Sequence, residues 1–368
     1  MEIILKNNRN IMYNILTCLE FKERYNLCIT NKDYLKNKFQ EYKHQELINI
    51  KCKDYLLSYK WSNIKFKIIL RNAKIKDVSI LRNIHTLDLS KCKNIKDVSM
   101  LGNVHTLNLS ECENISILGN SKTIWNCNTL DLSNCNNIKD VSMFKNVNTL
   151  DLSWCNKITN VSMLGNVDTL DLSWCDKIKD ISMLYNVRVL YLSHCTNITN
   201  ITNNKSKDLN NKFSNEIKWR CQKLDLSYTN ITDISMLGNI SILDLSYCDN
   251  ITDISMLGNG HALYLSNCKN IVKWCNKEKW DYHIVDLSYT NITDTSMLEN
   301  IHILNLSNCK NIIDVSILKN VNDLDLSSTN IENVVMLKNV NSLILNNCEN
   351  IPQGQINYLR KNIKNFMY

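Results

Sequence analysis

The stretch from Asn148 to Ile178, NTLDLSWCNKITNVSMLGNVDTLDLSWCDKI, nearly repeats itself after twenty residues. The phrase that begins at Leu150 returns at Leu170, and related phrases recur along most of the chain in steps of 20 or 19 residues. Its first apolar residue falls at Leu87, Leu107, Leu130, Leu150, Leu170, Leu190, Leu224, Leu243, Leu263, Val285, Leu304, Leu324 and Leu343. A unit this short cannot enclose a core alone, so neighbouring copies must stack to bury their apolar side chains. The repeat therefore predicts a solenoid.

The repeat resembles the leucine-rich repeat, whose pattern is L-x-x-L-x-L-x-x-N/C-x-I/L. Residues 147–158, VNTLDLSWCNKI, form one complete match. The resemblance covers 64–351 and, with a degenerate first copy from Ile68, gives about 14 repeats. It implies an α/β solenoid with a parallel β-sheet on its concave face. Copies of 19 or 20 residues imply short 3₁₀ or extended returns in place of full helices.

A cysteine column follows the predicted strands in the 20-residue copies. Its members are Cys92, Cys112, Cys135, Cys155, Cys175, Cys195, Cys248, Cys268, Cys309 and Cys348. Threonine replaces cysteine in the 19-residue copies, as at Thr229, and neither a C-x-x-C pair nor a histidine occurs at metal-ligand spacing. We therefore interpret the column as small buried residues whose S–H groups serve the turn, and we predict no metal and no cofactor.

A second polar column precedes each hydrophobic return. It comprises Asp97, Asp140, Asn160, Asp180, Asp233, Asp253, Asp294 and Asp314. Aspartate and asparagine accept hydrogen bonds from backbone N–H groups at the start of a helical turn, so capping of the return is the predicted role.

The middle residue of each strand is usually acidic and is predicted to face the concave side of the sheet. The candidate acidic residues for partner binding are Asp151, Asp171, Asp225 and Asp244. We expect a solvated column, which would leave a negative stripe suited to a basic partner.

The residue before the cysteine or threonine varies most and is aromatic in five consecutive copies. Together with two tyrosines in the middle strand position, the candidate binding residues are Trp154, Trp174, Tyr191, His194, Tyr228, Tyr247 and Tyr264. Exposed aromatic side chains offer large contact area with few rotatable bonds, which favours a partner-binding patch. The alternative is that the rings stack on one another and only shield the sheet.

Three steps of the repeat are longer than the others, and the extra residues lie at 115–128, 201–222 and 272–283. Each insertion carries tryptophan and cysteine. Insertions in solenoids emerge as surface loops that can contact partners, or their tryptophans can pack back on the coils; the sequence leaves both open. After Pro352 an apolar stripe of Ile356, Leu359, Ile363 and Phe366 predicts a capping helix over 352–368.

The first 48 residues differ from the rest and read as three short helices. Ile15-Leu16-Thr17-Cys18-Leu19 and the later Leu27-Cys28-Ile29, with Tyr34 in place of a tryptophan, resemble the F-box. That resemblance implies docking on a Skp1-like adaptor of a cullin-RING ubiquitin ligase. The implied adaptor contacts are Ile11, Ile15, Leu16, Leu19, Leu27 and Tyr34. The alternative is a helical cap for the first repeat.

The predicted organisation is a helical F-box-like module at 1–48, a linker and cap at 49–63, the repeats at 64–351 and the capping helix at 352–368. The implied function is a non-catalytic substrate receptor, and the alternative is a plain binding scaffold or sequestering protein. No phosphate loop, nucleophile elbow or paired-carboxylate site indicates an enzyme.

The composition indicates which partners and which cellular location to expect. Of 43 basic residues 17 lie in 1–82, while the remainder of the chain is slightly acidic, which argues against a nucleic-acid partner. The absence of a signal peptide or a long apolar run predicts a cytoplasmic protein with reduced cysteines and no membrane contact. We expect a monomer. The asparagine-rich composition suggests an AT-rich genome, such as that of a giant DNA virus, with the host cytoplasm or nucleus as the place of action.

Overall fold

The computed structural model describes residues 67–368 except 83, 120–122, 202–218 and 275–279. The chain forms two compact units, Met1–Ile158 and Thr159–Tyr368. The predicted F-box-like module at 1–48, with its adaptor contacts from Ile11 to Tyr34, and the linker at 49–63 lie outside the described residues.

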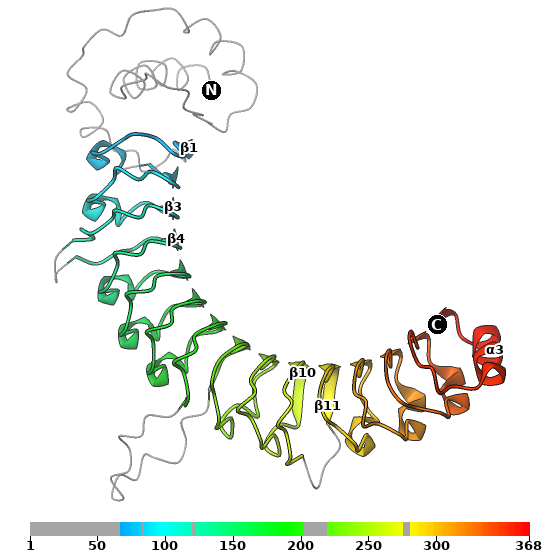
Figure 1. The fold of residues 1–368 in the computed structure, drawn as a ribbon. Helices are drawn as coiled ribbons and strands as arrows, with labels where there is room; N and C mark the ends of the chain where they lie inside the picture. The colour runs from blue at the N-terminus through cyan, green and yellow to red at the C-terminus, as the bar shows by residue number, and fades with distance from the viewer. Residues whose placement is uncertain (1–66, 83, 120–122, 202–218, 275–279) are drawn as a thin grey trace, which may run out of the picture. The chain divides into compact units, whose positions relative to one another are not determined.

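The strands in each unit are short and pair in parallel with their sequence neighbours, one strand per coil (Figure 1). In the first unit they are β1 (Lys67–Ile69), β2 (Thr86–Asp88), β3 (Thr106–Asn108), β4 (Thr129–Asp131) and β5 (Thr149–Asp151). The second unit holds β6 (Thr169–Asp171), β7 (Val189–Tyr191), β8 (Lys223–Asp225), β9 (Ile242–Asp244), β10 (Asn259–Tyr264), β11 (Asp281–Asp286), β12 (Ile303–Asn305), β13 (Asp323–Asp325), β14 (Ser342–Ile344) and β15 (Asn365–Met367). The repeat spacing sets the register, because Leu87 aligns with Leu107 and Leu224 with Leu243.

The returns are 3₁₀ helices or turns on the side of each coil opposite its strand (Figure 1). The 3₁₀ helices are η2 (Ser79–Leu81), η3 (Ser99–Leu101), η4 (Ser142–Phe144), η5 (Ser162–Leu164), η6 (Ser182–Leu184), η8 (Ser296–Leu298), η9 (Ser316–Asn320) and η10 (Val335–Asn339). The predicted capping is confirmed. Asp97 Oδ1 accepts a hydrogen bond from Ser99 N at 2.9 Å, and Asp180 Oδ1 accepts one from Ser182 N at 3.0 Å.

The core of each coil consists of its strand leucines, the isoleucine after the turn and the apolar residues of the return. Leu170, Leu172, Ile178, Ile181 and Leu184 of one coil are all at most 1% exposed. The same positions are buried in the neighbouring coils, so equal spacing stacks equal side chains. The leucine-rich-repeat solenoid predicted from the sequence is the fold of the described chain.

The cysteine column ties each coil to the preceding one. Cys195 Sγ donates to Leu172 O at 3.0 Å, and Cys268 Sγ donates to Leu245 O at 3.0 Å. Thr229 does not copy this contact, because its Oγ1 donates at 2.7 Å to Leu226 O of its own coil. The cysteines of the described chain are free and buried, so they are structural residues in this fold.

The C-terminal segment departs from the prediction. The helix α3 (Gln353–Asn362) begins after Pro352 and buries Ile356 and Leu359, as expected of a cap. The chain then turns extended at Ile363, and Phe366 lies in β15, which pairs with β14. The helical stripe therefore ends before Phe366, because the last strand continues the sheet in place of a further helical turn.

Candidate functional site

The aromatic column occupies a left-handed backbone position in the turn, three residues after the last residue of each strand. Every coil has one such residue, with φ between 56° and 64°. In the aromatic coils these residues are Trp154, Trp174, His194, Tyr228, Tyr247 and Tyr289. This conformation allows a hydrogen bond between neighbouring coils. It directs Tyr228 N toward Ser246 O of the next coil, and the N–H donates to this oxygen at 2.9 Å.

Large side chains are unfavourable at this position. The left-handed conformation costs an L-residue roughly 1–2 kcal/mol, and asparagine tolerates it best after glycine. Asparagine stands there in other coils, at Asn134, Asn267 and Asn308. The aromatic coils therefore replace the residue that the backbone favours with residues that it disfavours.

Four of these rings form a continuous stack in the second unit, which we call the aromatic ladder: Trp174, His194, Tyr228 and Tyr247. The ring centroids are 3.8, 4.1 and 4.2 Å apart in that order, and the planes of neighbouring rings are within 12° of parallel. Burial lowers the pKa of His194, so its ring is neutral at pH 7. The stack offsets part of the backbone cost, since each aromatic pair contributes about 0.5–1.5 kcal/mol.

The ladder remains open to solvent along its ring edges. Tyr228 is 39% exposed and Tyr247 44%, while Trp174 and His194 are half-buried. Trp154, 46% exposed, belongs to the first unit. Tyr191 and Tyr264 lie in the middle strand position and are half-buried; Lys223 Nζ lies 4.8 Å from the ring centroid of Tyr191. The predicted patch thus separates into Trp154, the ladder and two strand-face tyrosines.

The acidic column is half-buried and its carboxylates also accept hydrogen bonds in the turns, while its role in partner binding stays a prediction. Asp171, Asp225 and Asp244 each accept a hydrogen bond through Oδ1 from the backbone N of the serine two residues later, at 2.8 to 2.9 Å. Asp151 makes the same contact with Ser153 at 2.9 Å. Burial, followed by the charges of Asp225 and Asp286, raises the pKa of Asp244.

Sequence reasoning missed the first strand position, which shares the strand face with the acidic column. In the second unit this position is apolar in five strands, at Val189, Ile242, Ala262, Ile284 and Ile303, and polar in the other five, whereas the first unit has threonine at Thr86, Thr106, Thr129 and Thr149. Residues two apart on a strand face the same way, so the alternation of I-L-D could have revealed this apolar row. The row makes the strand face of the second unit more apolar than that of the first.

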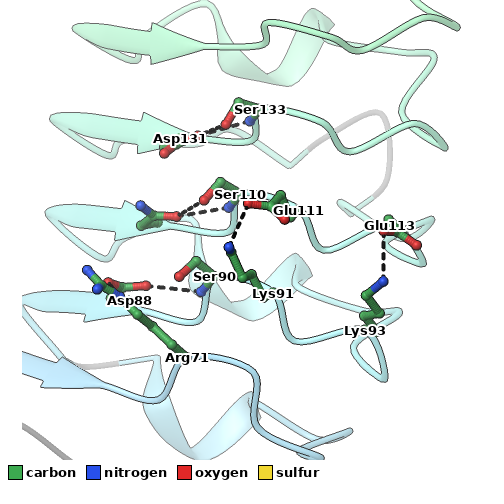
Figure 2. A network of polar contacts seen from close by, with 11 residues as sticks. Arg71, Asp88, Ser90, Lys91, Lys93, Ser110, Glu111, Glu113, Asp131 and Ser133 are labelled. Carbon is green, nitrogen blue, oxygen red and sulfur yellow. Dashed lines mark hydrogen bonds and ion pairs between the residues drawn. The ribbon is translucent and has the colours of Figure 1, made fainter. Parts of the chain in front are cut away.

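The first unit carries ion pairs between neighbouring coils (Figure 2). Arg71 Nε donates to Asp88 Oδ2 at 2.7 Å, and Lys91 Nζ lies 3.2 Å from Glu111 Oε1. Lys91 and Glu111 occupy the left-handed position that is aromatic in later coils. The same column is therefore polar and paired in the first unit's early coils and aromatic in the ladder.

Three of the four tryptophans in the inserted segments are buried, and the fourth, Trp274, is half-buried with its ring centroid 6.3 Å from that of Trp280. Trp125 is fully buried, donates through Nε1 to Leu118 O at 2.9 Å and meets Phe144 edge-on at 5.3 Å. Trp219 and Trp280 are 3% and 0% exposed. Of the two readings of the insertions, inward packing holds for these three rings, which are unavailable to a partner.

Other classes of site are not found in the part of the chain that the structure describes. There, no cluster of three or more histidine, cysteine, aspartate or glutamate side chains could hold a metal ion. Nor is any described helix long and apolar enough to span a bilayer.

No protein-family model and no curated protein sequence matches the chain. Several solved structures are similar at low identity. An internalin from Listeria monocytogenes is 14% identical over 90% of this chain and 86% of its own, with a TM-score of 0.34. The functional domain of InlJ from the same organism, which includes a cysteine ladder, is 18% identical over 74% and 70%, with a TM-score of 0.36. A leucine-rich-repeat protein from Leptospira interrogans is 15% identical over 82% and 83%, with a TM-score of 0.43.

Proposed function

We propose that the chain is a non-catalytic protein-interaction scaffold that binds a partner protein, with the aromatic ladder at the centre of the binding surface. The observation that carries this proposal is the continuous stack of Trp174, His194, Tyr228 and Tyr247 at left-handed positions. Residues held in unfavourable backbone conformations concentrate at functional sites, where the surrounding structure maintains them. The backbone conformation alone would favour asparagine in these coils.

The stacked rings also have the properties of a binding hot spot. Aromatic side chains supply much of the contact energy in protein interfaces. Because stacking fixes Tyr228 and Tyr247 before binding, their association with a partner costs little side-chain entropy. The apolar row that includes Ile242 lies on the adjoining strand face and extends the surface.

The test replaces Tyr228 and Tyr247 together with asparagine, which suits their backbone conformation. The matched control is Tyr289→Asn. This tyrosine has φ of 59° and is 50% exposed, but it lies between coils that carry Asn267 and Asn308. Affinity purification with mass spectrometry should show proteins that bind the wild type and the control but not the double variant. Equal recovery of all bound proteins by the three forms would refute the proposal.

We further propose that the captured protein is a ubiquitination substrate, with the N-terminal segment binding a Skp1-like adaptor in the cytoplasm. The F-box resemblance of Ile15-Leu16-Thr17-Cys18-Leu19 is the support for this step. A purified Skp1-like protein should bind the full chain and lose affinity for Leu16→Asp with Leu19→Asp. The Tyr228→Asn, Tyr247→Asn variant should keep adaptor binding. If the wild type does not bind the adaptor, the chain is a scaffold without a link to ubiquitin.

A further inference from the structure

We propose that the partner segment bound beside the ladder is basic and apolar, and that its arginine side chains bind Asp225 and Asp244. This inference rests on the proposed function and specifies the chemistry of the partner. The site consists of Asp225, Ile242, Asp244, Tyr228 and Tyr247, which we call the tyrosine–aspartate site.

The site comprises strand and turn residues of two neighbouring coils. Asp225 of β8 and Asp244 of β9 are register partners in the sheet. Tyr228 and Tyr247 follow in the same coils, with their rings stacked 4.2 Å apart. Ile242 shares the face of Asp244 and is half-buried. An occupant therefore meets an apolar side chain, two aromatic edges and two carboxylates together.

The two carboxylates retain an acceptor for a partner. Their Oδ1 atoms accept hydrogen bonds from Ser227 N and Ser246 N, both at 2.9 Å. Within the described residues, no ion pair forms at either aspartate and no hydrogen bond engages either Oδ2. Lys223, two residues before Asp225, has its ammonium group over the ring of Tyr191. The negative charge of this pair is thus left for a cation from outside the chain.

Asp88 shows within the same chain how an arginine completes such a site. It occupies the same strand position in the first unit, and its Oδ1 accepts from Ser90 N at 3.0 Å. Its Oδ2 accepts from Arg71 Nε at 2.7 Å (Figure 2). Burial opposes ionisation of Asp88, but the bonds from Ser90 and Arg71 prevail and lower its pKa. A partner arginine at Asp225 or Asp244 would repeat this contact, and leucine-like neighbours would pack on Ile242 and the tyrosines.

The experiment measures binding of the full chain to a fluorescent peptide in which arginine and leucine alternate. The variant Asp225→Asn with Asp244→Asn should weaken binding by about tenfold or more, since a hydrogen bond to a charged group contributes about 1.5–3 kcal/mol. Asparagine preserves the turn, because Asn108 already accepts from Ser110 N at 2.9 Å in this strand position. Asp325→Asn is the control; its coil has Ser328 in place of an aromatic residue, and its affinity should equal that of the wild type.

A second peptide, with glutamate in place of arginine, should not bind. Equal affinity for both peptides, no peptide binding at all, or unchanged affinity of the double aspartate variant would each overturn the inference. An equal loss in Asp325→Asn would also overturn it, by showing attraction to overall charge. If natural partners still require Tyr228 and Tyr247 while the basic peptide does not bind, the scaffold function stands and only the basic chemistry fails.

Discussion

Tyr228 and Tyr247 stack with their ring centroids 4.2 Å apart and their planes 10° from parallel, although each has a positive φ near 60°. Neither feature is independent of the other. The left-handed backbone places the side chain of each coil at the same point of the turn, and the parallel register brings successive rings into contact. The same residues therefore carry both the unfavourable backbone conformation and the favourable stacking of the rings.

These opposing terms predict different outcomes for two tyrosines in the same backbone position. Tyr289→Asn removes the backbone cost without removing a described ring contact, so it should stabilise the protein by roughly 0.5–1 kcal/mol. Tyr228→Asn also removes two stacks, so its free energy of unfolding should stay within about 1 kcal/mol of the wild type. Urea denaturation measures both. A destabilised Tyr289→Asn variant would contradict this explanation of the ladder.

Gly165 permits close approach between coils, and alanine there should be destabilising. A methyl group on Gly165 would lie 2.3 Å from the carbonyl oxygen of Met183 in the next coil. Because that neighbour is backbone, the coils must shift, which costs about 1–3 kcal/mol. Gly258→Ala is the matched control, since no atom lies within 4 Å of its added methyl group. Thermal denaturation should show a lower Tm for Gly165→Ala alone.

Asp244 and Asp88 should give opposite pH dependence when each is replaced by asparagine. The folded-state pKa of Asp244 lies above 3.8, mainly through burial, so its stabilising contribution is present below pH 3.8 and is lost as pH rises through the folded pKa. Asp244→Asn should therefore gain roughly 0.2–1 kcal/mol at neutral pH, the size of a like-charge pair between strands, and the gain should vanish in acid.

Asp88 has a folded pKa below 3.8, so its contribution is present above pH 3.8 and is lost as pH falls through the folded pKa. Asp88→Asn should lose about 1 kcal/mol at neutral pH, because the ion pair with the exposed Arg71 is screened by solvent. Urea titrations at neutral pH and at about pH 3, below the ordinary aspartate pKa, distinguish the two cases. The same sign of change in both variants would show that the acidic column has one uniform role.

The sequence predicted the features that depend on spacing. The leucine and cysteine columns recur because stacked coils bury equal positions, so the pattern itself carries the structural cause. It was less informative where one residue serves two roles. Asp244 belongs to a repeated D-L-S phrase, in which the backbone N–H of the serine two residues later donates a hydrogen bond to the carboxylate. This local turn therefore fixes the environment of the Asp244 carboxylate.

The sequence also contained a signal for the left-handed turn, but the aromatic residues in the same column made it hard to recognise. Asparagine at Asn134, Asn267 and Asn308 is typical of a positive φ, whereas Trp174 and Tyr228 in the same column suggest an ordinary exposed strand. The apolar row through Ile242 and Ile284 was missed because the leucine pattern on the opposite face dominates the strand. The fold thus followed from repetition, while the candidate site required the coordinates of the residues that vary.

The cysteine column should be chemically inert in the folded protein. Burial raises the pKa of Cys155 and Cys195 to about 12, and the Sγ atoms donate hydrogen bonds to leucine carbonyls of the preceding coil. The thiolate is the reactive form, so alkylation at neutral pH requires unfolding. Peptide mapping after iodoacetamide treatment should find these cysteines unmodified in the native protein and fully modified in denaturant. The destabilised Gly165→Ala variant should be modified faster than Gly258→Ala, because its unfolded state is more populated. Modification of Cys195 in the native protein at the rate of free cysteine would show that the column is accessible and would contradict its structural role.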